Sequence, residues 1–86
     1  MTRQDKLLGR FLSIPSDFSY IELRKLLRGF GFEEVRKGKT SGARVAFVNR
    51  QNHDIIRLHK PHPKAILRQY QVRLIVDALR EMGHIT

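Results

Sequence analysis

The chain has 86 residues, no cysteine and a formal net charge of +9, with 17 lysines and arginines against 8 acidic side chains. This length predicts one compact domain with a single core. The lack of cysteine excludes a disulfide framework, a cysteine-based zinc site and a thiol nucleophile. The first fifteen residues include charges and no long apolar run, so we expect no signal peptide, no membrane contact and a cytoplasmic location.

Two helices are predicted at the start of the chain. Thr2 with Asp5, and Ser19 with Glu22, have the spacing of a capping box. Apolar residues follow each box at helical spacing, at positions 7, 8, 11 and 12 and at positions 23, 26, 27 and 30. Pro15 ends the first pattern, and the second is expected to stop near residues 29–31, which include two glycines.

After the second helix the apolar period changes to two, which predicts three antiparallel strands. The apolar positions are Phe32 and Val35, then Ala43, Val45 and Phe47, then Ile56 and Leu58. Residues 37–42 and 49–54 are rich in glycine or polar residues and are predicted to be hairpin loops.

A last helix is predicted after the run Lys60-Pro61-His62-Pro63-Lys64. Each proline fixes its own φ and disfavours helix in the residue before it, so this run is expected to cross in an extended conformation. The apolar face of the helix comprises Val72, Ile75, Val76, Leu79 and Met82, and Gly83 is the expected C-terminal cap.

The positive charge is concentrated in the middle of the chain. Residues 36–73 hold ten lysines and arginines against Asp54 alone, whereas residues 1–35 and 74–86 together hold seven basic and seven acidic side chains. Such clustering is typical of a surface that binds phosphate groups, and a merely solubilising surface is the alternative.

Strand alternation groups several of these cations on one face of the sheet. If Phe47 faces the core, Arg44 points to the other side. If Ile56 also faces the core, Arg57 and His59 lie on the same side as Arg44. The pattern therefore predicts a cationic site that contains an imidazole and fits a phosphodiester.

Residues 19–83 resemble the HicA toxins of toxin-antitoxin pairs. The resemblance is carried by the helix from Ser19, the loop Lys37-Gly38-Lys39-Thr40-Ser41-Gly42-Ala43-Arg44, the strand ending in Phe47, the Lys60–Lys64 crossing and the helix over residues 70–82. It implies an α+β, double-stranded-RNA-binding-like α-β-β-β-α fold, with helices packed on one face of a three-stranded antiparallel sheet. It also implies mRNA interferase activity and neutralisation by a HicB-like antitoxin. Residues 1–18 would be an N-terminal helical extension to a HicA-like domain over residues 19–86.

The chain departs from the family pattern at one position. The usual loop reads Gly-Ser-His, with the histidine taken as catalytic, whereas alignment on Phe47 gives Gly42-Ala43-Arg44 here. Arginine is not deprotonated in proteins, so Arg44 can stabilise a charged phosphorane but cannot accept a proton. Imidazole suits proton transfer near neutral pH. His59 is therefore the candidate replacement, and His62 is the second candidate.

The sequence thus predicts a set of site residues with two roles. The catalytic candidates are His59, Arg44 and Lys39, and the RNA-binding candidates are Lys37, Arg57, Lys60, Lys64 and Arg68. His59 and His62 are spaced like a chelating pair, but no carboxylate or cysteine joins them, so we expect no metal. We also expect no cofactor.

Three functions remain open at this stage. The first is a metal-independent endoribonuclease toxin, and the second is an RNA-binding module of the same fold that does not cleave, which the arginine at position 44 favours. The third is an interaction protein whose charge docks an acidic partner. RNA cleavage separates the first two, and salt-sensitive RNA binding without a partner counts against the third.

Overall fold

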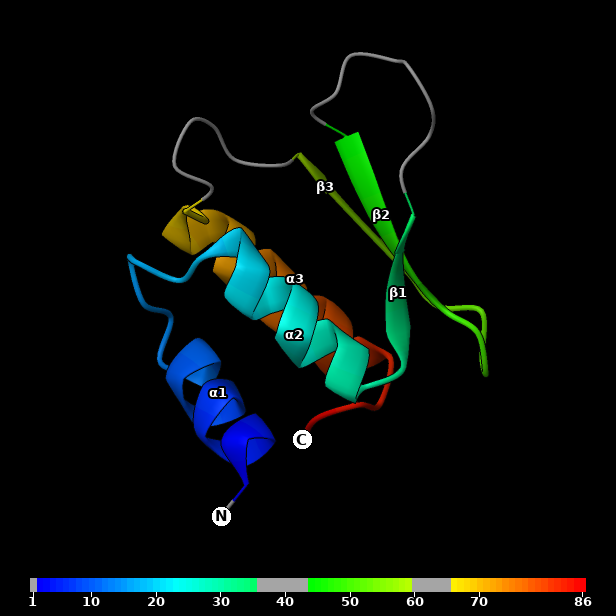
Figure 1. The fold of residues 1–86 in the computed structure, drawn as a ribbon, viewed down its shortest axis with the longest axis horizontal. Coiled ribbons are helices and arrows are strands. Elements are labelled where there is room, and N and C mark those ends of the chain that lie inside the picture. Colours follow the sequence, from blue (N-terminus) through cyan, green and yellow to red (C-terminus); the bar gives the residue numbers. More distant parts are fainter. Residues whose placement is uncertain (1, 36–43, 60–65) are drawn as a thin grey trace.

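The computed structural model describes residues 2–35, 44–59 and 66–86 (Figure 1). Its elements, in chain order, are α1 (Arg3–Leu12), α2 (Tyr20–Gly29), β1 (Phe32–Val35), β2 (Arg44–Asn49), β3 (Ile55–His59) and α3 (Gln69–Glu81). The predicted α+β class and the α-β-β-β-α order are confirmed, with α1 as an additional helix before them.

Both predicted capping boxes are present. The Thr2 hydroxyl accepts a hydrogen bond from the Asp5 amide at 3.1 Å, and the Asp5 carboxylate accepts one from the Thr2 amide at 3.2 Å. The Ser19 and Glu22 pair is built in the same way, with bonds of 3.1 and 3.0 Å. These bonds satisfy amides that a helix N-terminus leaves without partners, so the first turn of each helix is fixed locally.

The three strands form an antiparallel sheet in the order β1-β2-β3, with β2 in the centre. Phe32 pairs with Asn49 at one end of β1, and Phe47 pairs with Ile56 between β2 and β3. The outer edges of β1 and β3 have no strand partner among the described residues.

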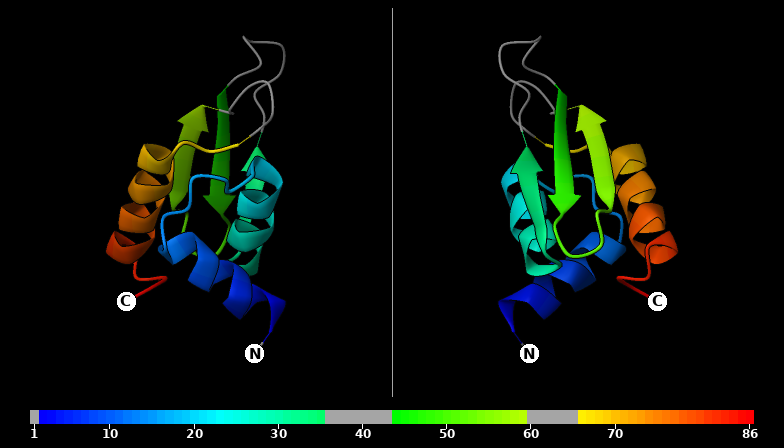
Figure 2. Two further views of the ribbon diagram at one scale, coloured as in Figure 1. Left: turned by 90° about the vertical axis from the view of Figure 1, so that its left-hand side faces the viewer. Right: turned by 90° about the vertical axis from the view of Figure 1, so that its right-hand side faces the viewer.

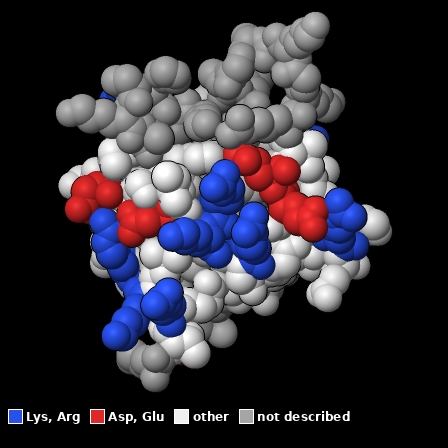
Figure 3. All heavy atoms as spheres, viewed as in Figure 1, with Lys and Arg blue, Asp and Glu red and all other residues white. Residues whose placement is uncertain are grey.

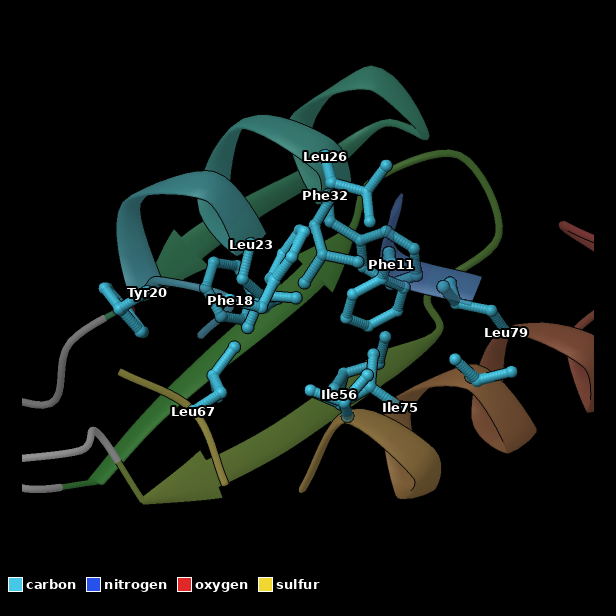
Figure 4. Close-up of a cluster of buried hydrophobic side chains, with 14 of the residues drawn as sticks. Phe11, Phe18, Tyr20, Leu23, Leu26, Phe32, Ile56, Leu67, Ile75 and Leu79 are labelled. Atoms are coloured by element: carbon cyan, nitrogen blue, oxygen red, sulfur yellow. The ribbon is translucent and has the colours of Figure 1, made fainter. Parts of the chain in front are cut away.

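One face of the sheet is covered by α2 and α3, which lie side by side upon it (Figure 2). The core between these layers is apolar (Figure 4). Its strand residues are Phe32, Val45, Phe47 and Ile56, and α2 and α3 contribute Leu23, Leu26, Leu27, Val72, Ile75, Val76 and Leu79. The helical stripes and the inward strand positions follow the predicted periodicities.

Helix α1 packs against both α2 and α3 and adds to the same core. Phe11 is completely buried, and its ring centroid lies 4.8 Å from that of Phe18, which is also completely buried. The extension therefore buries aromatic surface together with the α-β-β-β-α unit, and each such side chain contributes about 1.5–3 kcal/mol of transfer free energy.

The segment after the proline-rich crossing is fastened to the start of α2. Ile66 forms an isolated antiparallel bridge with Ser19, and the Leu67 amide donates to the Phe18 carbonyl at 2.8 Å. Leu67 is completely buried. This contact joins two stretches far apart in the sequence, and none of the local patterns predicted it.

The turns contain the residues that their backbone conformations require. Gly31 after α2 and Gly83 after α3 have φ of 94° and 83°, which glycine adopts without strain. Asn49 is buried at the β2–β3 turn, where its side-chain amide donates to the Phe30 carbonyl at 2.9 Å and its oxygen accepts from the Gln51 amide at 2.9 Å. None of the helices in the described part of the chain has the length and apolar character of a membrane span.

Candidate functional site

The sheet face opposite the helices is uncovered over the described residues, and we call it the open face (Figure 2, right). The β2–β3 register sets position 44 directly across from His59, Ala46 across from Arg57, and Val48 across from Ile55. Directly paired positions lie on the same face of a sheet. The register therefore brings positions 44, 57 and 59 to one face, as the alternation predicted.

The centre of the open face is aliphatic. Val35 and Ile55 are 43% and 39% exposed, and Ala46 and Val48 between them are half-buried. The sequence pattern listed Val35 with Phe32 as apolar positions of period two. The two residues are three positions apart, however, and residues an odd number apart occupy opposite faces of a strand. The described open-face positions carry no phenyl, phenol or indole ring, so a platform for base stacking is absent there.

His59 ends β3 with an exposed imidazole. Its backbone carbonyl accepts a hydrogen bond from the Gln71 side-chain amide at 3.1 Å. The Gln71 side-chain oxygen accepts from the Arg68 amide at 3.0 Å, immediately before α3 begins. Gln71 therefore ties the strand end that carries His59 to the helix start that carries Arg68.

The sequence prediction did not include Gln71. The sequence did contain a local indication of its role. Arg68 is the residue before the helix, and a glutamine three residues after that residue occupies the capping-box position. Its second bond, to a strand carbonyl twelve residues away, depends on the tertiary structure and has no local signature. Gln71 is half-buried and positions two site candidates through their backbones.

The remaining predicted cations divide between the described and undescribed parts of the chain. Arg57 and Arg68 are exposed, Arg57 on the open face and Arg68 at the start of α3. The other predicted residues Lys37, Lys39, Lys60 and Lys64, together with His62, lie outside the described residues, as does the side chain of Arg44.

The far end of the open face carries an ion pair. The Glu33 carboxylate lies 2.9 Å from the Arg50 guanidinium. The carboxylate that β1 carries on the open face is therefore neutralised by an arginine of the β2–β3 turn. Arg57 and His59 lie toward the opposite end of the sheet. The described part of the face is thus neutral at one end and basic at the other, which favours an anionic ligand at the His59 end.

The other described histidines have different surroundings. His53 is exposed in the β2–β3 turn with φ of 63°. His84 contacts the Asp54 carboxylate at 3.3 Å, and its ring lies 5.2 Å from that of Phe32. Among the described residues, no three histidine or carboxylate side chains gather as a metal site. His84 therefore has a packing role, which the sequence did not indicate.

Comparison with known proteins gives one family. A family model described as the HicA toxin of bacterial toxin-antitoxin matches residues 21–83, which is most of the chain. Neither the curated proteins nor the solved structures give a match. The matched region begins in α2 and ends just after α3, so it spans the sheet and both of its covering helices. The chain belongs to the HicA toxin family.

Proposed function

We propose that this chain is an RNA-binding endoribonuclease, an mRNA interferase toxin that a HicB-like antitoxin neutralises, and that its site is the basic end of the open face. Family membership supports the toxin assignment. The observation that carries the site is the β2–β3 register, which sets His59 directly across from position 44, where the family usually has its histidine.

In the proposed reaction the 2′-hydroxyl of a ribose attacks the adjacent phosphorus. The new bond joins the 2′-oxygen to phosphorus while the bond from phosphorus to the 5′-oxygen breaks, leaving a 2′,3′-cyclic phosphate. The His59 imidazole accepts the 2′-hydroxyl proton, and the departing 5′-oxygen takes up a proton from water. Charge develops on the phosphorane oxygens, and Arg44 with Lys39 stabilises it electrostatically.

Exposure and anchoring of His59 support this role. Its imidazole is exposed on a face that none of the helices in the described residues covers, which suits contact with an RNA strand. Its main chain is held by Gln71, which limits the movement of the strand end. Arg57 on the same face and Arg68 at the start of α3 supply phosphate contacts, and we assign Lys37, Lys60 and Lys64 to the same binding role.

A second function is favoured by the residue at position 44. Because arginine cannot accept a proton, the fold could retain RNA binding while its cleavage chemistry is lost. The same cations would then hold the RNA backbone without breaking it. This alternative predicts salt-dependent retention of intact RNA.

The test is cleavage of a labelled RNA in the presence of a chelator, beside a copy with a single 2′-deoxy linkage. We expect the ribose linkage to give cyclic-phosphate ends and the deoxy linkage to survive. His59→Gln is expected to lose cleavage at that linkage while it retains RNA binding. His53→Asn is the matched control, since His53 is exposed in a turn and asparagine tolerates its positive φ.

The outcomes separate the proposals. If His59→Gln cleaves like the unchanged protein, His59 is not the proton-transfer residue, although the class of reaction stands. If the unchanged protein binds RNA without cutting it, the binding module is the function. If it neither binds nor cuts RNA, both RNA functions are wrong.

A further inference from the structure

A second basic surface lies on the helical side of the molecule, where α1 packs against α2. The Gln4 side-chain amide donates to the Leu26 carbonyl at 3.0 Å, and at the other end the Arg10 guanidinium contacts the Glu22 carboxylate at 3.0 Å. Gly29 leaves the room that Gln4 occupies, because a Cβ atom there would meet the Gln4 side chain at 2.3 Å. These contacts hold the two helices together along their lengths.

The acidic side chains of this region are engaged in specific contacts. Asp5 and Glu22 accept capping-box hydrogen bonds, and Glu22 and Asp17 also contact Arg10. Glu34 lies 3.7 Å from Arg24 and accepts a hydrogen bond from the Tyr20 hydroxyl. Residues 1–35 are nearly balanced in charge along the sequence, but the fold commits their acids to caps and to three arginines, Arg10, Arg24 and, for Glu33, Arg50.

Four cations stay exposed on this surface, and we call them the helical cationic band. They are Arg3 and Lys6 on α1 and Lys25 and Arg28 on α2. None of the four forms an ion pair with another described residue. Figure 3 shows basic side chains gathered over the middle of α2 and over α1, with acidic groups at the margins.

The surroundings of the band fit a phosphate backbone better than a protein. Protein interfaces need an apolar centre of several residues. The exposed large apolar side chains of α1 and α2 are Leu12 and Ile21 alone, and Gln4 and Gly29 lie where the two helices meet. Electrostatic contact with phosphates needs exposed cations and no such centre. Lys25 and Arg28 are three residues apart on a helix, so their side chains are neighbours on one face.

We propose that the helical cationic band is a second contact surface for the phosphate backbone of a long RNA, separate from the open face. This inference rests on the proposed RNA function. Two of the four cations belong to α1, which precedes the region matched by the family model. The band would lengthen the RNA footprint and would not take part in cleavage.

The experiment compares two single-stranded RNAs over a salt series. One is a short oligonucleotide that contains a cleavable linkage, and the other is longer than the 39 Å longest dimension of the protein. Lys25→Gln with Arg28→Gln removes two charges from the band. Arg73→Glu is the control, because it changes the net charge by the same two units at an exposed position of α3, outside the band.

For the long RNA, we expect the double variant to flatten the plot of log affinity against log salt by about 0.7 for each cation removed, and the control to change it less. For the short RNA, affinity and cleavage stay as in the unchanged protein. The charge-preserving pair Lys25→Arg with Arg28→Lys is expected to retain long-RNA binding. Circular dichroism spectra compare the folds of all four proteins.

Three results would overturn the proposal. The first is equal salt slopes for the double variant and the control, which would make the effect one of net charge. The second is that the double variant binds the long RNA like the unchanged protein but no longer binds an acidic protein partner. The third is an equal loss on the short RNA, which would place the band in the primary site. Failure of the proposed RNA function can be distinguished from failure of the band proposal, because the unchanged protein would then bind neither the short nor the long RNA.

Discussion

The two faces of the sheet use the same strands but have different surroundings. On the covered face, Val45 and Phe47 are at most 5% exposed beneath the helices. On the open face, Ile55 is 39% exposed, and Arg57 and His59 are also exposed. Alternation along a strand thus places core positions beside exposed positions of the candidate site. A residue on the open face can change with little effect on the core.

The largest expected effect on the free energy of unfolding comes from a substitution on the covered face. Phe47→Ala should lower the free energy of unfolding by about 3–5 kcal/mol, because it removes a completely buried ring and leaves a cavity. Val48→Ala, one residue along the same strand but half-buried on the open face, should cost about 1 kcal/mol or less. Urea denaturation of both variants measures the difference, and equal losses would contradict the separation of the two faces.

A smaller effect is expected where the sheet turns back on itself. Asn49→Ala should lower the free energy of unfolding by about 1–3 kcal/mol, because the Phe30 carbonyl loses its amide donor and the turn amides lose their acceptor. Gln51→Ala in the same turn is the control. Its side chain is exposed, so its effect should stay within about 0.5 kcal/mol. A thermal melt that ranks the two variants in the opposite order would refute the role of Asn49.

The smallest effect concerns the start of the helix that covers β1. Ser19→Ala should cost about 1 kcal/mol through the loss of the cap to the Glu22 amide. Ser16→Ala, at an exposed position before the helix, should be nearly neutral. Native-state hydrogen exchange should show faster exchange of the Glu22 amide in Ser19→Ala alone. If both variants leave that amide equally protected, the cap does not hold the first turn.

Features encoded by nearby residues could be predicted from the sequence. The capping boxes, the apolar stripes, the strand alternation and the glycine after each main helix depend on residues a few positions apart. The fold resemblance also followed from the sequence, and the family match agrees with it. The packing of Phe11 into the core and the contact of Leu67 with Phe18 could not be predicted in this way, because they join elements through tertiary structure.

The candidate site was predictable to a similar extent. The shared face of Arg57, His59 and position 44 followed from alternation and agrees with the register. The anchoring of His59 by Gln71 did not follow, since it links a strand end to a helix start. The helical cationic band was also hidden, because charge counted along the chain does not reveal which acids the fold engages. The chemical roles of the site residues stay predictions.

The outer edges of β1 and β3, which have no strand partner in the described part of the chain, bear on how this protein behaves at high concentration. An exposed strand edge is a template on which further molecules can stack into fibrils. Here β1 carries Glu33 and Glu34, and β3 carries Arg57. Pairing two β3 edges would bring the Arg57 guanidinium groups together, whereas Glu33 and Glu34 of β1 are already matched by Arg50 and Arg24. The charge of Arg57 therefore opposes pairing of two β3 edges when many copies accumulate.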